Sequence, residues 1–198
     1  MRIKAVGHTE SPWRVHAFVE DFELLDVWRM PVEGEPHESL ADYERTVSEV
    51  EAQLLTSGPA GWLFRLRLWL GRALGWDETP ERLTIPGTGH GSLRDRLPEA
   101  LRGTVEDAEP ASGTDFTEVY RLPDETAREI SNKTVHALMH TAKVPLGEGR
   151  WGVEMAVYCK ARGWKGRAYM ALIDPFRHFV VYPALMRLVG RAWARRVR

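Results

Sequence analysis

The sequence predicts an α+β fold in which a curved antiparallel sheet grips a long C-terminal helix, with two further helices in the N-terminal half. Three observations predict it. The apolar period is helical between residues 40 and 74, it changes to two after Asp115, and the pair Asp174-Pro175 then precedes an amphipathic stretch. With 198 residues, of which 43% are apolar, we expect a single helix-grip domain over residues 1–198, large enough to leave room for a cavity.

Composition and charge argue against a secreted, a metal-binding or a nucleic-acid-binding protein. The net charge is -1, although residues 20–51 contain eleven carboxylates and only two arginines, whereas six arginines and no acid follow Asp174. A single cysteine, Cys159, excludes an internal disulfide, no Cys/His cluster has metal-ligand spacing, and MRIKAVGHTE lacks the apolar run of a signal peptide. We therefore expect a cytoplasmic protein with no metal, no cofactor and no nucleic-acid partner. The sequence does not determine the oligomeric state.

Two helices are predicted before residue 75. The first runs from Leu40 to Leu55, because its apolar residues recur at spacings of three and four and Ser39 is a suitable N-cap. The second, Ala60 to Leu74, reads WLFRLRLWLGRAL over most of its length and is apolar on nearly every side. Such a helix either packs on two sides or touches lipid, and packing is favoured because arginine stems lie readily across apolar surface. A short helical piece from Ser92 to Arg102 is interrupted by Pro98.

Four strands are predicted after Asp115, joined by short, turn-rich segments. Consecutive hairpins of this kind form an antiparallel sheet. The predicted strands are Phe116–Leu122, Arg128–Val144, Trp151–Lys160 and Gly166–Ile173.

The closing helix is predicted from Pro175 to Arg195. Asp174 is a suitable N-cap, proline is suited to the first helical turn, and Pro183 should kink the helix. We expect Phe176 and Phe179 to be buried on its apolar side and the arginines at 187, 191 and 195 to face solvent. Pro183 interrupts the longest apolar run near the C-terminus, which is too short for the ~20 residues of a membrane span.

Two stretches carry a resemblance to a known family: EISNKTVHALMH (residues 129–140) and GVEMAVYCKARGWKGRAYMALIDPFRHFVVYPALMRLVGRAW (residues 152–193). They resemble the bacterial domain-of-unknown-function family 2867, which is similar to the START and pollen-allergen-like (SRPBCC) helix-grip proteins. The resemblance extends from Asp26 onward, and its most specific part is the pattern G-R-x-Y-x-x-x-I-x-P-F-x-x-x-V-V, which begins at Gly166. Many relatives have histidine directly after the Pro-Phe pair, where this chain has Arg177 followed by His178. The resemblance implies a helix-grip fold and the binding of apolar ligands, and it implies no reaction.

The segment from residue 129 to 141 is the most informative place for chemistry. Asn132, Thr134, His136 and His140 alternate onto one face, with Leu138 among them. In one interpretation this face lines a cavity and orients a mostly apolar ligand, and His136 is a candidate general acid or base. In the other, the strand is turned over, so that Val135, Ala137 and Met139 pack inward and the polar face is exposed to water. The period alone does not choose between them. Metal binding by the two histidines is not expected, because four strand residues span about 13 Å.

Arg167 and Tyr169 share a face of the last predicted strand. As a buried pair they would anchor a carboxylate or a carbonyl group. The alternative is an arginine at the edge of the sheet and a tyrosine in the core.

Three hypotheses follow. The favoured one is a module that binds a small, largely apolar molecule between the sheet and the C-terminal helix. The second is an enzyme of the cyclase or dehydratase kind, with His136 and Tyr169 as catalytic candidates for proton transfer. The third, not favoured, is a peripheral membrane protein that uses the Trp62–Leu74 helix and the arginine-rich tail. The predicted ligand-binding residues are Asn132, Thr134, His136, Leu138, His140, Arg167, Tyr169, Phe176 and Phe179.

Overall fold

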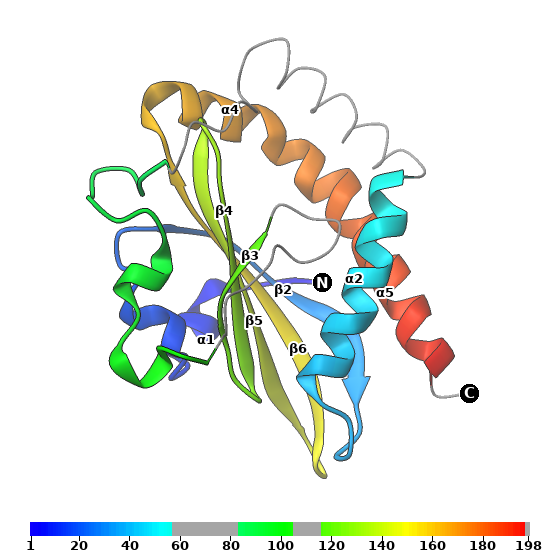
Figure 1. Ribbon diagram of the computed structural model, residues 1–198. Helices are drawn as coiled ribbons and strands as arrows, with labels where there is room; N and C mark the ends of the chain where they lie inside the picture. The colour runs from blue at the N-terminus through cyan, green and yellow to red at the C-terminus, as the bar shows by residue number, and fades with distance from the viewer. Residues whose placement is uncertain (57–82, 105–115, 197–198) are drawn as a thin grey trace.

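The structure is a computed structural model that describes residues 1–56, 83–104 and 116–196. Six antiparallel strands form one curved sheet in the order β1-β2-β6-β5-β4-β3 (Figure 1). The predicted α+β class, with a sheet gripping a long C-terminal helix, is confirmed. The strands are β1 Arg2–Ile3, β2 Glu23–Gly34, β3 Thr117–Arg121, β4 Glu125–Ser131, β5 Val135–Gly147 and β6 Arg150–Ala161.

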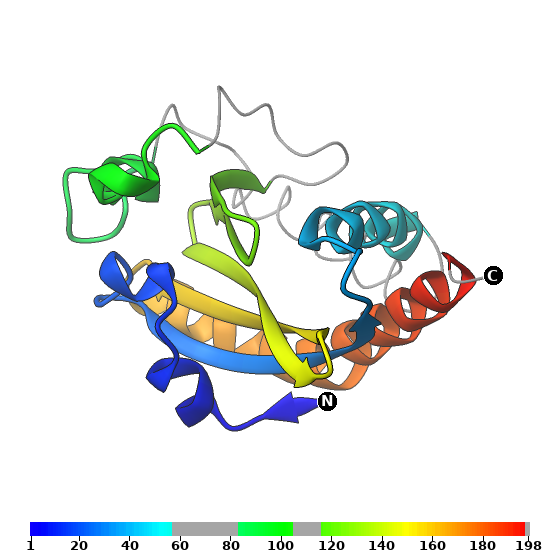
Figure 2. The same cartoon turned by 90° about the horizontal axis from the view of Figure 1, so that it is seen from below.

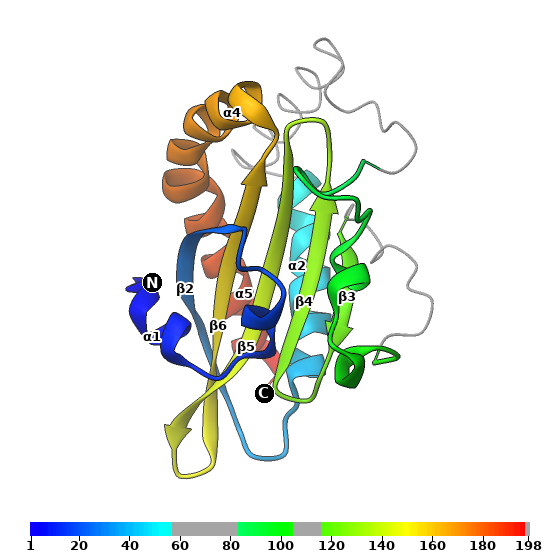
Figure 3. The same ribbon diagram turned by 90° about the vertical axis from the view of Figure 1, so that its left-hand side faces the viewer.

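Helices lie on both sides of this sheet. Short elements on one side include α1 (Ala5–Glu10), and long helices cover the other side, as Figure 3 shows. In the described residues, no helix combines the length and apolarity needed to cross a bilayer. The remaining helical elements are η1 Arg14–Ala17, α2 Leu40–Thr56, η2 Leu93–Arg96, η3 Glu99–Leu101, α4 Gly163–Phe176, the π-helical turn η4 Arg177–Val181 and α5 Tyr182–Arg196.

The face of the sheet toward α2, α4 and α5, which we call the helix face, carries a large apolar core under α2 and α5 and a smaller cluster under α4. The predicted stripe of α2 packs there beside α5, and Figure 2 shows these two helices side by side. Side chains of both helices and of β2, β5 and β6 fill the space between α5 and the sheet. The buried members include Trp28, Met30, Leu40, Tyr43, Val47, Val153, Met155, Leu185, Val189 and Trp193.

The opposite face, which we call the loop-covered face, carries a second core. Residues 13–22, η2 and η3 lie over it, and α1 lies at its edge (Figure 3). Its buried members include Val15, Phe18, Phe22, Ile85, Leu93, Leu97, Leu101, Val119, Tyr120, Leu138, Ala156 and Tyr158. Successive residues of a strand point to opposite faces of the sheet. Because both faces are covered, side chains on either face of a central strand are shielded from water.

The prediction of a single strand over Arg128–Val144 is wrong in one respect, because these residues belong to two strands, β4 and β5. A tight turn at residues 132–134 separates β4 from β5. The side-chain oxygen of Asn132 accepts hydrogen bonds from the backbone N–H groups of Thr134 (2.9 Å) and Val135 (3.0 Å). Such a side-chain bond to the following backbone is how asparagine stabilises turns.

The predicted strand Gly166–Ile173 is wrong, because these residues belong to helix α4. Gly166, Tyr169 and Ile173 stand three and four residues apart and form its sheet-facing side. A Cβ atom at residue 166 would collide with the carbonyl oxygen of Thr134, so glycine lets the helix approach the β4–β5 turn.

The closing helix therefore begins earlier than predicted, at Gly163 rather than near Pro175. Pro175 lies inside α4, where its ring removes a helical hydrogen bond, and the π-helical turn η4 follows directly. This irregular turn precedes the site at Pro183 where a kink was predicted. The predicted helix Ala60–Leu74 lies outside the described residues.

Candidate functional site

Strands β4 and β5 place two glutamates and two histidines together on the loop-covered face. Glu125 and Glu129 stand four apart on β4, and His136 and His140 stand four apart on β5. The register sets each glutamate diagonally across from one histidine, within reach of a long side chain. His136 Nε2 lies 2.7 Å from Glu129 Oε2, and His140 Nε2 lies 2.9 Å from Glu125 Oε2. All four residues are buried.

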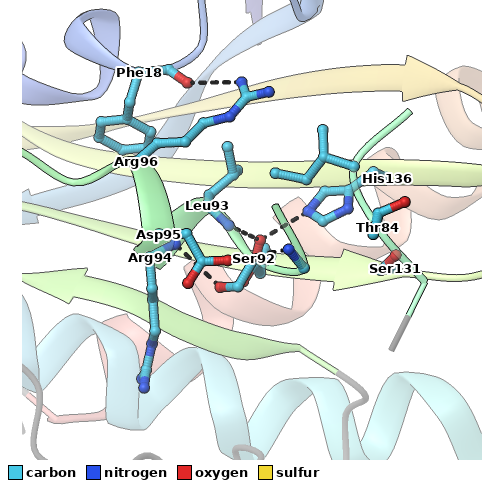
Figure 4. Close-up of polar contacts among 12 residues, drawn as sticks. Phe18, Thr84, Ser92, Leu93, Arg94, Asp95, Arg96, Ser131 and His136 are labelled. Carbon is cyan, nitrogen blue, oxygen red and sulfur yellow. Dashed lines mark hydrogen bonds and ion pairs between the residues drawn. The ribbon is translucent and has the colours of Figure 1, made fainter. Parts of the chain in front are cut away.

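The His136–Glu129 pair anchors η2 to the sheet. The Glu129 carboxylate also accepts hydrogen bonds from the Ser92 hydroxyl and from the backbone N–H of Leu93 (2.9 Å), which brings the start of η2 beside His136 (Figure 4). Ser92 is in turn the N-cap of η2 and forms a capping box with Asp95. One buried carboxylate therefore binds a histidine and a loop at the same time.

The His140–Glu125 pair anchors the N-terminal segment in the same way. Glu125 accepts hydrogen bonds from the Tyr120 hydroxyl (2.8 Å) and from the backbone N–H of Arg14 (3.0 and 3.1 Å). Burial opposes ionisation of Glu125, but hydrogen bonds from His140, Arg14 and Tyr120 hold its pKa below the usual value. The carboxylate is therefore ionised at neutral pH.

Two further histidines extend the polar network beyond His140. His8 Nε2 lies 2.9 Å from the Tyr158 hydroxyl, and His16 Nδ1 lies 3.4 Å from the same oxygen. The ring centroids of His8 and His140 are 5.2 Å apart, and those of Trp13 and His140 are 5.9 Å apart. We call His8, Trp13, Glu125, His140 and Tyr158 the His140 cluster.

The imidazoles of this cluster are neutral at physiological pH. Burial, reinforced by the neighbouring His140 and His16, lowers the pKa of His8 to about 3. Burial also lowers the pKa of His140, against the opposing effect of Glu125. A neutral imidazole has one donor and one acceptor nitrogen, so each ring can both give and take a hydrogen bond.

Several polar atoms of these residues have no hydrogen-bond partner. In the described part of the chain they include the buried Nδ1 atoms of His8, His136 and His140 and the buried Nε1 atom of Trp13. An unpaired buried polar group costs about 1–3 kcal/mol, so such atoms are uncommon in a core. Three of the four belong to His8, Trp13 and His140, whose rings pack together.

The arrangement is suited to hydrogen bonding and proton transfer rather than to metal binding. Within residues 1–56, 83–104 and 116–196, no group of three or more His, Cys, Asp or Glu side chains could hold a metal ion. Because Glu125 is ionised, the shared proton of its bond to His140 resides on Nε2. Nδ1 of His140 is then an unprotonated acceptor.

The residues of the predicted polar stripe lie in two places, on strand β5 and in the β4–β5 turn. His136, Leu138 and His140 all lie on the loop-covered face, so they point away from α5 and not toward the predicted cavity. Of the two interpretations of this strand, the structure agrees with the one in which Val135 and Met139 pack toward the helices, although loops cover the polar face, which is not exposed to water. Asn132 and Thr134 belong to the β4–β5 turn, where the Thr134 hydroxyl donates to the Asn132 side chain (2.7 Å).

The other predicted residues lie on the C-terminal helical run. Tyr169 is buried on the helix face beside Val135 and Cys159, whereas Arg167 is exposed. His136 and Tyr169 are thus on opposite faces of the sheet and cannot act together on one substrate. Phe176 and Phe179 are exposed, and their predicted burial is wrong.

A second polar centre on the helix face involves residues that the resemblance had singled out. Asp26 Oδ1 lies 2.7 Å from His178 Nε2, and the other oxygen of Asp26 pairs with Arg177 and lies 3.4 Å from the Tyr182 hydroxyl. A bulge in β2 between Leu24 and Asp26 accompanies this orientation of Asp26. The π-helical turn thus brings two successive side chains, Arg177 and His178, onto a single buried carboxylate.

Sequence reasoning missed Glu125, Glu129, His8 and Trp13. One signal was available for the glutamates, because ETAREIS repeats the four-residue spacing of the two histidines. No local pattern indicates His8 or Trp13, because more than a hundred residues separate them from His140.

The comparisons with known proteins identify a family and no function. No curated protein and no solved structure matches the chain. One family model, described as "Protein of unknown function (DUF2867)", matches residues 18–184, which include both polar centres apart from His8 and Trp13. The chain therefore belongs to the DUF2867 family.

Proposed function

We propose that this protein binds a small, largely apolar molecule at the His140 cluster, on the loop-covered face of the sheet. The observation that carries the proposal is the set of unpartnered buried nitrogens on the packed rings of His8, Trp13 and His140. Ligand sites commonly combine apolar walls with a few convergent polar groups. Here the apolar side chains would come from the core of the loop-covered face, which includes Val15 and Leu138.

The polar groups of the His140 cluster indicate which functional group the ligand has. Nδ1 of His140 accepts a hydrogen bond, whereas Nε1 of Trp13 can only donate one. A hydroxyl group can satisfy both, because its proton points to His140 while its oxygen accepts from Trp13. The proposed ligand is therefore an apolar molecule bearing an alcohol or phenol hydroxyl.

The covering segment provides the route of entry. Residues 13–22 close the loop-covered face, and the backbone N–H of Arg14 is bonded to Glu125. Lifting this segment breaks that bond and opens the His140 cluster while leaving the sheet intact. Ligand binding is thereby coupled to the position of the N-terminal segment.

A matched pair of probes, p-cresol and toluene, tests the proposal because they differ only in a hydroxyl group. We expect p-cresol to bind about tenfold more tightly than toluene, the equivalent of one good hydrogen bond, and to shift the Nδ1 resonance of His140 in ¹⁵N NMR spectra. Trp13→Phe, which removes the N–H donor together with part of the ring, should reduce the difference, because only the hydrogen bond to His140 remains. His37→Gln, at an exposed histidine, is the control and should change nothing.

Two outcomes would overturn the proposal. Equal affinity for the two probes would show that the polar atoms do not select a hydroxyl group. Binding of p-cresol without a change in the resonances of His8, Trp13 or His140 would place the ligand elsewhere.

We also propose a cytoplasmic location. The single cysteine supports it, because Cys159 is free and buried and the chain therefore has no internal disulfide of the kind common in secreted proteins. Fractionation of cells that express the chain with an epitope tag tests this, and recovery from an extracellular or periplasmic fraction would contradict it.

A further inference from the structure

Helix α4 and the turn η4 present an apolar face to solvent. The exposed fractions are 69% for Trp164, 60% for Leu172, 46% for Phe176 and 81% for Phe179. Spacings of eight, four and three residues place these side chains along one side of the helical run. In the part of the chain that the structure describes, the other large exposed apolar side chains are Met1, Val6 and Leu146, which lie on other elements.

The opposite side of the same run is fixed to the sheet. Gly166 lies against the Thr134 carbonyl oxygen, and Tyr169 is buried beside Val135. Arg177 and His178 are bonded to the buried carboxylate of Asp26. These contacts hold the helix in one rotation, with Phe176 and Phe179 directed outward.

Positive charge accompanies this apolar face. Lys165 lies beside Trp164, with its Nζ 6.0 Å from the ring centroid. The helical run continues into α5 (Figure 1). The exposed residues of α5 include Arg187, Arg191 and Arg195. Asp174 is the only acid from residue 163 onward, and Arg177 and His178 both lie against it.

We infer that the outer side of α4, η4 and α5 docks onto a bilayer surface that contains anionic lipid. Helices that lie in the plane of a bilayer combine bulky apolar and aromatic residues with a basic flank, as this run does. Each basic residue near an anionic surface contributes about 1 kcal/mol. The bilayer is contacted and not crossed.

The charge distribution distinguishes a bilayer from a second copy of the chain. In a symmetric dimer through this face, each surface would meet an identical one, so Lys165 and the arginines would face their own counterparts. Like charges across an interface oppose association. Anionic headgroups, by contrast, complement these cations while the acyl boundary takes up the aromatic rings.

This surface shares the arginine-rich tail with the one that the sequence indicated for membrane contact. Its apolar part lies on α4 and η4, whereas the Trp62–Leu74 helix of that hypothesis lies outside the described residues. It is also independent of the proposed ligand site, which lies on the other face of the sheet. Failure of one proposal therefore leaves the other intact.

Vesicle flotation with the full chain tests the inference. One set of vesicles contains phosphatidylcholine alone, and the other contains phosphatidylcholine with phosphatidylglycerol. We expect binding to the mixed vesicles that is weakened, and not abolished, by physiological salt, because apolar insertion is not screened. The double substitution Phe176→Ser and Phe179→Ser should reduce the partition coefficient about tenfold or more. Leu146→Ser, at an exposed apolar residue near the end of β5, is the matched control and should change it little.

Urea unfolding and sedimentation of the same variants complete the experiment. The double variant should unfold at the same urea concentration as the wild type, because both rings are exposed. A large loss of stability would show that another part of the chain covers this face, and loss of a dimer in the variant would show that a second copy does. Either result, or absence of binding to the mixed vesicles, would overturn the inference.

Discussion

His140 Nε2 lies 2.9 Å from Glu125 Oε2, and the same diagonal relationship recurs four residues along the two strands between His136 and Glu129. Each carboxylate also accepts a backbone N–H from a segment that covers the sheet, Arg14 in one case and Leu93 in the other. The two pairs therefore orient the histidines and fasten the covering layer.

Glu125→Gln tests how much this fastening stabilises the fold. The substitution keeps the size of the side chain but removes the charge, and an amide cannot accept all the hydrogen bonds that the carboxylate accepts from His140, Tyr120 and Arg14. We expect the free energy of unfolding to fall by about 2–4 kcal/mol in equilibrium urea titrations. Glu148→Gln, at an exposed position in the β5–β6 turn, is the control and should lie within about 0.5 kcal/mol of the wild type. Similar small changes in both variants would show that the Glu125 network is not stabilising.

The elements that the sequence predicted well are those in which a single period governs burial. The stripe of α2 keeps Leu40, Tyr43 and Val47 against one core, and no other periodicity fits those residues. Strand β6 was likewise predicted within one residue at each end. In both cases local spacing and tertiary burial agree, which is the condition under which sequence patterns are informative.

Helix α4 was mistaken for a strand because its sequence satisfies two periods at once. In GRAYMALI, Arg167, Tyr169 and Ala171 alternate, whereas Gly166, Tyr169 and Ile173 follow helical spacing. The feature that accompanies the helical packing is tertiary, namely the close approach of Gly166 to the Thr134 carbonyl oxygen. A single-sequence pattern contains no information about that contact.

The candidate site was predicted in part, and for a similar reason. The alternation of His136, Leu138 and His140 correctly placed them on one face, but it could not say which layer covers that face. Both faces of β5 are covered, since Leu138 is buried under the loops while Met139 packs toward the helices. The partners His8 and Trp13 come from a distant segment whose docking depends on Glu125.

The stability of the protein should depend on pH below neutrality because His8 is buried in the neutral form. Its pKa is lowered from the ordinary value of 6.5 to about 3, so the unfolded chain takes up a proton at pH 5 and the folded chain does not. The contribution of the neutral His8 to the free energy of unfolding is therefore complete above pH 6.5 and is lost as the pH falls toward 3. For His8 the loss between pH 6.5 and 5 is about 2 kcal/mol, and His140, whose pKa is also lowered, changes stability in the same direction.

Urea unfolding at a series of pH values, with His8→Gln as the informative variant, checks this expectation. The variant should be less stable at pH 7.5, because its bond to Tyr158 is altered, and its stability should decline less steeply between pH 6.5 and 5. His90→Gln, at an exposed histidine, should keep the slope of the wild type. A slope that His8→Gln leaves unchanged would mean that this imidazole is protonated in the folded protein.

Phe179→Ala distinguishes the exposed ring of the structure from the buried ring that the sequence predicted. Burial of this ring predicted a loss of about 3–5 kcal/mol on its removal. With Phe179 81% exposed, we now expect a change within about 0.5 kcal/mol in urea unfolding. Leu185→Ala, on the buried side of α5, should cost about 2–5 kcal/mol in the same experiment. Comparable losses in the two variants would show that Phe179 is buried, as the sequence predicted, and that the closing helix is rotated relative to this structure.

Gly166→Ala and Gly7→Ala form a matched pair that tests the docking of α4 on the β4–β5 turn. Both glycines lie in helices, where alanine is intrinsically favoured by about 1 kcal/mol. At Gly7 nothing lies near the added methyl group, so the substitution should be neutral or slightly stabilising. At Gly166 the methyl group would meet the Thr134 carbonyl oxygen, and backbone atoms on both sides must separate to admit it. We expect a net loss of about 1–3 kcal/mol in urea unfolding, and a stabilising Gly166→Ala would show that α4 does not make this close approach.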